Sequence, residues 1–316
     1  MYNSDVIRAT PLSAAPKLPA TVGLGLMALV VTLLSWSGRN IDAFDMSYRA
    51  FEGEPWRLLT SALPHVGAMH LLFNLFWLWR LGSLLEQRYG SARTFLFYLL
   101  VGAGSAAAEH AFFRGGVGLS GVGYGIVGFL TVAHRRDPKL SDAMDARTTQ
   151  LFVIWFFFCI GLTVTKVMPI ANVAHGAGFV LGALFGCAAS AKASSRYALA
   201  SAAGALLLAC FVASAWLRPW VNWGEGGGLA AWADAQKAYE AADYTESERL
   251  YEYATAVDPE DARLWFNLGV TRQRMENDAG ARAAYERASA LAPDEARYAE
   301  AAQGMRAVHG PAPASP

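Results

Sequence analysis

The stretch GLSGVGYG, residues 118–125, is rich in glycine and yet lies between two apolar runs. A bilayer core offers no water to unpaired peptide groups, so a loop-like entry there needs surrounding protein or a water-filled cavity. Ser120 then begins the helix that follows, where unpaired N–H groups and the positive end of the helix dipole favour a developing negative charge. Ser120 is therefore a candidate nucleophile, provided that a base can reach it.

The composition indicates a membrane protein with a polar appendage. Of 316 residues, 54% are hydrophobic and 16% are charged, against about 25% charged in soluble domains. Residues 229–316 contain 9 Lys and Arg against 15 Asp and Glu, whereas residues 1–228 contain 17 against 11. The chain offers no basic patch for nucleic acid. The three cysteines lie in apolar runs without Cys/His metal spacing, so we expect no metal and no cofactor.

Apolar runs predict an all-α polytopic bundle with seven membrane helices. The fourth is too short for a bilayer core of about 30 Å, which needs ~20 residues. It must therefore begin partway into the membrane, which places Ser120 at depth. The first run reads as a retained span and not as a cleaved signal. The seven helices are expected at residues 18–36, 69–89, 95–113, 120–134, 148–164, 172–191 and 197–216.

The basic residues of the short loops predict the orientation. The loops 134–147 and 190–196 and the turn after the second span are rich in Lys and Arg, whereas Arg114 and Lys166 stand nearly alone on the opposite side. The N-terminal segment is then cytoplasmic, and seven crossings leave the C-terminal domain outside. The expected domains are a segment 1–17, a six-span core 18–191, an extra span 197–216, a glycine-rich linker 217–228, a repeat domain 229–306 and a disordered tail 307–316.

An internal repeat occupies the C-terminal domain. Three residues recur at a shift of 34 positions, namely Tyr251, Ala254 and Pro259 at Tyr285, Ala288 and Pro293. This period resembles tetratricopeptide repeats, which have two helices each. We expect a small α-helical solenoid that a final helix, at about residues 294–305, would cap.

Glycines at four-residue spacing predict which membrane helices cross closely. His175 begins the sixth span and is followed by Gly178 and Gly182, while the fourth span offers Gly121. Small residues at this spacing let two helices approach each other. The crossing would bring His175 to Ser120 and create a serine–histidine dyad.

Further polar residues in the spans supply the rest of the expected site. His70 and Asn74 lie one turn apart on one helix face. Together with the N–H of Ser120, they could hold an oxyanion. Tyr124, one turn after Ser120, is expected to pack against the imidazole and orient it. No acidic residue next to His175 in sequence would complete a triad.

The motifs together resemble the rhomboid family of intramembrane serine proteases, over roughly residues 18–190. The resemblance implies that Ser120 is the nucleophile, that His175 is the general base, and that His70 and Asn74 belong to the oxyanion site. It implies structural roles for Arg57 and Glu86. The matching pieces are Pro55-Trp56-Arg57, His70-Leu-Leu-Phe-Asn74 running on to Glu86, Gly118-Leu-Ser120-Gly121 with Tyr124, and Ala174-His175-Gly-Ala-Gly178 running on to Gly182.

The same resemblance implies a location and a substrate class. A seventh span before a tetratricopeptide-like domain resembles some bacterial members, so we expect the inner membrane of a bacterium. The partners would be the lipid bilayer, transmembrane protein substrates cleaved in or near their membrane segments, and a protein bound by the repeat domain. That domain would recruit or regulate substrates.

Other readings of these residues remain open. Ser120 could be only a helix N-cap, and His70 and Asn74 could merely bond spans together. The chain could be a non-catalytic membrane adaptor that holds partners through its acidic repeat domain. A transporter is disfavoured because the sequence shows no inverted repeat of broken helices.

Four further expectations concern polar residues near the span ends. His65 is assigned no role beyond an interface or substrate contact, and Asn172 is expected near the substrate. Arg80 should snorkel or pair with Glu86 or a lipid headgroup. Residues 109–110, a glutamate and a histidine, should be interfacial.

Overall fold

The computed structural model describes residues 7, 10–51, 53–113, 115–221 and 229–309. The chain divides into two compact units, Met1–Leu217 and Arg218–Pro316. Every regular element in the described residues is helical, as predicted. Arg8, Arg114, residues 222–228 and residues 310–316 lie outside the described residues, and so do the expectations that depend on them.

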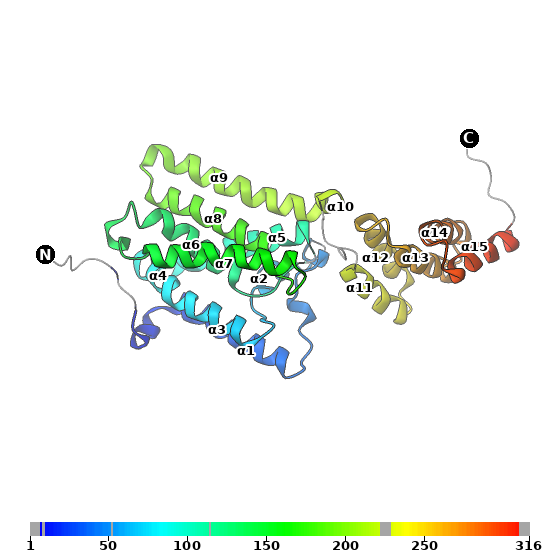
Figure 1. Ribbon diagram of the computed structural model, residues 1–316, viewed down its shortest axis with the longest axis horizontal. Helices are drawn as coiled ribbons and strands as arrows, with labels where there is room; N and C mark the ends of the chain where they lie inside the picture. The colour runs from blue at the N-terminus through cyan, green and yellow to red at the C-terminus, as the bar shows by residue number, and fades with distance from the viewer. Residues whose placement is uncertain (1–6, 8–9, 52, 114, 222–228, 310–316) are drawn as a thin grey trace. The chain divides into compact units, whose positions relative to one another are not determined.

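The first unit is a bundle of long helices joined by short helical turns (Figure 1). In the figure, α9 and α1 lie on opposite sides of the bundle with α6 between them. The α-helices of this unit are α1 (Pro19–Trp36), α2 (Arg57–Thr60), α3 (Ala68–Trp77), α4 (Ser83–Tyr89), α5 (Ser91–Phe112), α6 (Ser120–Ala133), α7 (Ala146–Val164), α8 (Asn172–Ser190) and α9 (Ala193–Val212). The short turns are η1 (Leu12–Lys17), η2 (Asp42–Phe44), η3 (Tyr48–Phe51) and η5 (Pro138–Leu140), with π-helical turns η4 (Leu78–Gly82) and η6 (Ala213–Leu217).

Six described helices are long and apolar enough to cross a membrane, which makes the chain an integral membrane protein. α6 has only 14 residues and is shorter than these six, in agreement with the prediction for the fourth apolar run. The six candidate spans are Pro19–Trp36, Ala68–Tyr89, Ser91–Phe112, Ala146–Val164, Asn172–Ser190 and Ala193–Leu217.

Several helices begin or end at other residues than the apolar runs predict, because capping residues determine where a helix starts and stops. α5 begins at Ser91, not at residue 95, since Gly90 at φ 82° ends α4 and the next helix starts at once. α7 begins at Ala146 because the carboxylate of Asp145 accepts the N–H of Thr148 at 2.7 Å. The expected linker 217–228 also begins as helix, since α10 covers Arg218–Val221.

The close crossing predicted from the glycines is present, because α6 packs against α8 more extensively than any other pair of helices does. A Cβ on Gly178 would collide with the carbonyl of Gly121, and a Cβ on Gly182 would collide with the carbonyl of Gly125. Backbone therefore touches backbone along this crossing. Only glycine permits that approach.

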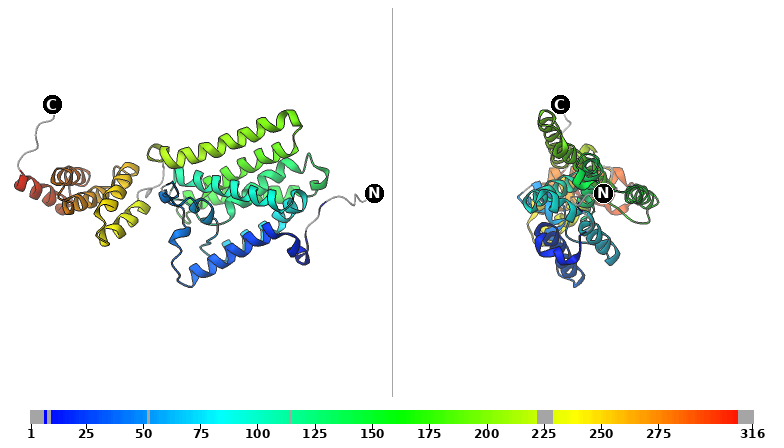
Figure 2. Two further views of the ribbon diagram at one scale, coloured as in Figure 1. Left: turned by 180° about the vertical axis from the view of Figure 1, so that it is seen from behind. Right: turned by 90° about the vertical axis from the view of Figure 1, so that its left-hand side faces the viewer.

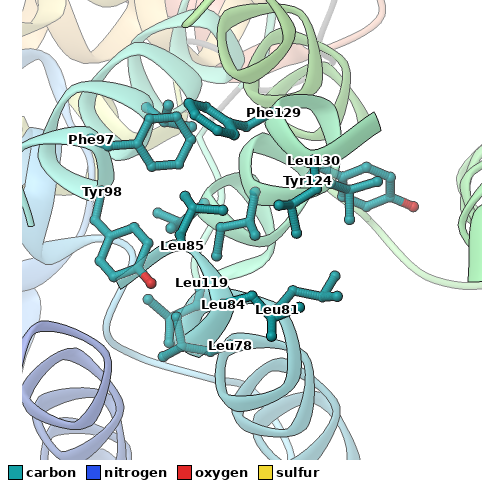
Figure 3. Packing of buried hydrophobic residues seen from close by; sticks show 14 of the residues in the cluster. Leu78, Leu81, Leu84, Leu85, Phe97, Tyr98, Leu119, Tyr124, Phe129 and Leu130 are labelled. Atoms are coloured by element: carbon teal, nitrogen blue, oxygen red, sulfur yellow. The ribbon is translucent and has the colours of Figure 1, made fainter. Parts of the chain in front are cut away.

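Apolar side chains from several helices fill the centre of the bundle (Figure 3). The second span supplies four buried leucines, α5 supplies Phe97 and Tyr98, and α6 supplies Phe129 and Leu130. The π-helical turn η4 lies within this span, where a Cβ on Gly82 would collide with the hydroxyl of Tyr98. The leucines are Leu78, Leu81, Leu84 and Leu85.

Buried polar groups fasten the ends of the spans. Glu86 accepts the N–H groups of Ala20 at 2.9 Å and Thr21 at 2.7 Å, and so caps the start of α1. At the other end of the bundle, His110 Nδ1 lies 2.8 Å from Ser214 Oγ, which joins α5 to η6. The sequence analysis expects an interfacial His110, and its side chain is buried within the bundle against η6.

The second unit consists of helices arranged as successive antiparallel neighbours along the chain (Figure 2). The last helix continues to His309, past residue 307, where the sequence analysis expects a disordered tail. After α10, the helices are α11 (Leu229–Glu240), α12 (Tyr244–Val257), α13 (Ala262–Arg274), α14 (Asp278–Leu291) and α15 (Ala296–His309).

The 34-residue period of the sequence is visible in the backbone of this unit. Ala242 and Glu276, 34 positions apart, have φ angles of 59° and 58°. The residues that follow them, Asp243 and Asn277, each accept an N–H from the residue three positions later. The two turns that begin α12 and α14 are therefore built in the same way.

Candidate active site

Ser120 and His175 meet where α6 and α8 begin. Ser120 is the first residue of α6, and His175 lies in the first turn of α8. His175 Nε2 is 2.8 Å from Ser120 Oγ, within hydrogen-bond distance. The imidazole is 4% exposed, and the serine is half-buried. A hydroxyl and a base thus share a hydrogen bond at the N-terminus of a helix, which is the geometry of an activated nucleophile.

Tyr124 holds the imidazole from one side. Its ring stacks on that of His175, with centroids 4.5 Å apart and planes 22° from parallel. Phe152 and Phe156 of α7 contact the Tyr124 ring edge-on. Packing therefore restricts the orientation of His175, as the sequence analysis expects of Tyr124.

His70 lies against the loop that precedes Ser120. Gly118 has φ 108°, a conformation that favours glycine, and a Cβ there would be 2.6 Å from His70 Cε1. Asn74 is buried and its amide donates to the carbonyl of His70, one turn earlier, at 2.9 Å. The glycine thus permits the histidine ring to approach the backbone next to the nucleophile.

A family comparison covers this site. The family model for the Rhomboid domain matches residues 52–192, which include Ser120 and His175. Residues 52–192 of this chain are similar to the rhomboid domain. The match lies within the first unit and does not extend to the helices of the second.

Curated relatives of the rhomboid domain are bacterial proteins named Rhomboid protease GlpG. The one from Serratia proteamaculans is 35% identical over 176 residues, which are 52% of this chain and 61% of the relative. The one from Enterobacter sp. is 32% identical over 148 residues, 46% of this chain and 53% of the relative. The one from Haemophilus influenzae is 29% identical over 180 residues, 52% of this chain and 88% of the relative. The chain thus spans only about half to three-fifths of the length of the first two.

Glu109 is a member of the site that the sequence analysis missed. It is 4% exposed, and its carboxylate accepts the N–H of Ala174 at 2.9 Å and also that of Val173. These N–H groups belong to the first turn of α8, so Glu109 of α5 caps the helix that carries His175. The sequence analysis expects an interfacial glutamate, and the side chain is buried within the bundle. Its partners are backbone groups, which leave no pattern in the sequence.

His65 is also buried, at 2% exposed, although the sequence analysis gives it no structural role. Its Nε2 is 3.3 Å from the N–H of Leu119, the residue before Ser120. Its ring contacts that of His70 edge-on, with centroids 4.8 Å apart. The first unit therefore places two histidines beside the loop 118–120, and sequence reasoning found only His70.

Arg57 and Glu86 act at a distance from the dyad. Arg57 is buried, bonds to Glu54 and donates to the carbonyls of Asp42 and Asp45, which ties together the loop before α3. Glu86 caps α1 as described above. Both contacts fit the structural roles that the resemblance implies.

The structure answers the expectation for Arg80 and gives Asn172 a structural contact, while the nearness of Asn172 to a substrate stays a prediction. Arg80 lies at a pocket with Asp142, Asp145 and Thr148, whereas the carboxylate of Glu86 bonds to α1, so an Arg80–Glu86 pair is wrong. Residues six apart on a helix face different directions. Asn172 donates to Thr163 Oγ1 at 2.8 Å, which ties the end of α7 to the start of α8.

In the described part of the chain, no group of three or more His, Cys, Asp and Glu side chains could hold a metal ion. The three cysteines are free thiols within the first unit.

Proposed function

We propose that this chain is an intramembrane serine endopeptidase that hydrolyses peptide bonds in or near the transmembrane segments of other proteins. One observation carries the proposal, namely the 2.8 Å contact between His175 Nε2 and Ser120 Oγ at the close crossing of α6 and α8. The names of the bacterial relatives support it.

The reaction follows from this geometry. His175 accepts the proton of Ser120 as the hydroxyl attacks the peptide carbonyl, and then donates it to the leaving amine. Water, activated by the same imidazole, releases the acyl group. The oxyanion is held by the N–H of Ser120 together with His70 and Asn74, and one such donor is typically worth ~3–4 kcal/mol.

The substrate must unwind locally before it reacts. Carbonyl groups within a helix are already hydrogen-bonded and shielded, so a membrane helix resists attack along its length. We expect cleavage near small residues in a helix-breaking context, toward the outer end of the substrate segment. We expect the loop 118–120 at the start of α6 to lie at the matching depth.

The orientation and location are part of the proposal. The basic loops after the second, fourth and sixth spans favour a cytoplasmic N-terminus, and seven crossings would leave residues 229–316 outside the cytoplasm. The bacterial relatives favour the inner membrane of a bacterium. A cysteine-accessibility scan of the second unit with an impermeant reagent tests this topology.

The second unit would recruit or regulate substrates. Its helices repeat with the period of tetratricopeptide arrays, and the turns before α12 and α14 have the same construction. Such arrays bind protein segments on extended surfaces. If the chain were only an adaptor, this unit would account for all of its function.

The decisive experiment compares the wild-type chain with Ser120→Ala in proteoliposomes that contain a model transmembrane substrate. We expect wild type to cleave the substrate and Ser120→Ala to leave it intact. A fluorophosphonate probe should label wild type and spare both Ser120→Ala and His175→Ala. Cleavage by Ser120→Ala at the wild-type rate would contradict the proposal and favour a non-catalytic membrane adaptor.

A further inference from the structure

His65 connects the segment before α3 to the loop that carries the nucleophile. Two successive N–H groups of that loop donate to this segment. Gly118 N–H donates to the carbonyl of Ser61 at 3.1 Å, and Leu119 N–H donates to His65 Nε2 at 3.3 Å. The loop is thus fastened at both residues that precede Ser120.

The contacts assign the protonation state of His65. A backbone N–H can only donate, so Nε2 must carry a lone pair and the ring proton must be on Nδ1. Nδ1 lies 2.9 Å from the carbonyl of Leu63, which accepts that proton. A doubly protonated ring would instead direct an N–H at the N–H of Leu119. The geometry therefore requires the neutral Nδ1–H tautomer.

The surroundings keep this ring neutral and fixed. From α1, the neutral side chains of Thr32 and Trp36 bond to the segment, with Trp36 Nε1 donating to the carbonyl of His65 at 3.0 Å. The titratable group that faces the ring is His70. Burial, with a smaller contribution from His70, lowers the pKa of His65 to about 4.

We propose that His65 is a positioning residue: as an acceptor for the N–H of Leu119, it fixes the peptide planes of the loop 118–120 and so aims the next N–H, that of Ser120, at the oxyanion. This inference rests on the proposed function. His65 does not touch the reacting atoms. Its contribution is geometric, and small misplacements of catalytic groups cost up to about 10²-fold in rate.

Two amide substitutions at His65 distinguish the contribution of Nε2 from that of Nδ1. A glutamine side chain reaches as far as Nε2 and can present an oxygen to Leu119 N–H, whereas an asparagine reaches only as far as Nδ1. We expect His65→Gln to keep kcat within about 3-fold of wild type. We expect His65→Asn to lower kcat about 30-fold with little change in KM, because misaimed donors act in the transition state.

The controls distinguish this inference from the proposed function. Both variants exchange one imidazole for one amide, so their thermal unfolding should be similar while their rates differ. Equal rates for the two variants would overturn the positioning role, and so would a rise in KM without a change in kcat. Cleavage by Ser120→Ala would instead overturn the proposed function.

A measurement on the wild-type chain avoids any dependence on folding of the variants. In ¹⁵N-histidine-labelled protein in detergent, the His65 ring, assigned by its contact with Thr32, should show a protonated Nδ1 and an unprotonated Nε2 at neutral pH. A protonated Nε2 would contradict the proposal directly.

Discussion

Asn74 makes a structural contact in addition to the oxyanion role proposed for it. Its amide donates to the carbonyl of His70, which keeps the two donors one turn apart on the face of α3. An amide has a second N–H that remains available for a ligand. The pair is therefore preorganised before a substrate arrives, and preorganised donors act without reorganisation during the reaction.

Replacing Asn74 by alanine should slow the chemical step. Loss of one oxyanion donor typically lowers kcat by about 10²-fold, with KM nearly unchanged. Steady-state cleavage of a transmembrane substrate in proteoliposomes measures both constants. A kcat within twofold of wild type would show that Asn74 only bonds the spans together.

The pH dependence of stability should report His65. Its pKa is about 4 in the folded chain, below the ordinary value of 6.5, so the unfolded chain binds the proton more tightly. Stability from this group is present above pH 6.5 and is lost as the pH falls toward 4. Denaturant unfolding of wild type should therefore weaken more steeply over this window than that of His65→Gln. Parallel curves for the two proteins would contradict this expectation.

At the scale of elements, the α6–α8 crossing sets the distance between the serine and the histidine. Helices that meet through backbone cannot absorb added volume by moving side chains. The closely packed glycines Gly178 and Gly182 lie on the same face of α8 as His175, which begins that crossing. Any added methyl group must therefore move a whole helix.

Gly182→Ala should separate the two helices, because its Cβ would collide with the carbonyl of Gly125. We expect a loss of about 1–3 kcal/mol in stability and a large loss of fluorophosphonate labelling. The matched control is Gly204→Ala in α9, where a Cβ meets nothing within 4 Å. That control should unfold at the same temperature as wild type or higher. Equal behaviour of the two variants would show that the crossing is loose.

Glu109→Ala should loosen the start of α8. It would leave the N–H groups of Val173 and Ala174 without their acceptor in a buried site, at a cost of about 1–3 kcal/mol. Glu109→Gln retains an acceptor oxygen and should recover most of the thermal stability and labelling. If Gln behaves like Ala, the negative charge at the helix start matters more than the hydrogen bond.

The residues that sequence reasoning found and missed differ in the kind of partner they have. Ser120 and His175 could be paired from the sequence because the glycine spacing that joins their helices is itself a pattern. Glu109 and His65 bond to backbone N–H groups of distant segments, and any residue can supply such a group. Because Glu109 and His65 lie near the ends of spans, the sequence alone predicted contacts with the membrane interface or a substrate and not these hydrogen bonds.

At the scale of the whole molecule, the two units are separable in principle. The segment that is similar to the rhomboid domain, residues 52–192, contains the residues proposed for catalysis, whereas the helices of the C-terminal repeat begin at residue 229. Only the first unit could be assigned a reaction from its sequence, since a repeat period predicts architecture and not a ligand.

Deleting residues 229–316 should leave hydrolysis of a minimal transmembrane substrate within about threefold of wild type, because the deletion removes none of the groups proposed for catalysis. Cleavage of the physiological substrate should fall if the second unit recruits it. Competition between substrates in one membrane measures that difference. Loss of hydrolysis of the minimal substrate would mean that the second unit is required for the core reaction.

The contact between His110 and Ser214 joins α5 to η6, at the end of the last candidate span of the first unit. His110 follows Glu109 directly in α5. His110 therefore contacts η6, while its neighbour Glu109 accepts a hydrogen bond from the start of α8. Two neighbouring residues of α5 thus connect η6 with the first turn of the helix that carries His175. A chain shortened before residue 214 would lose the contact with η6.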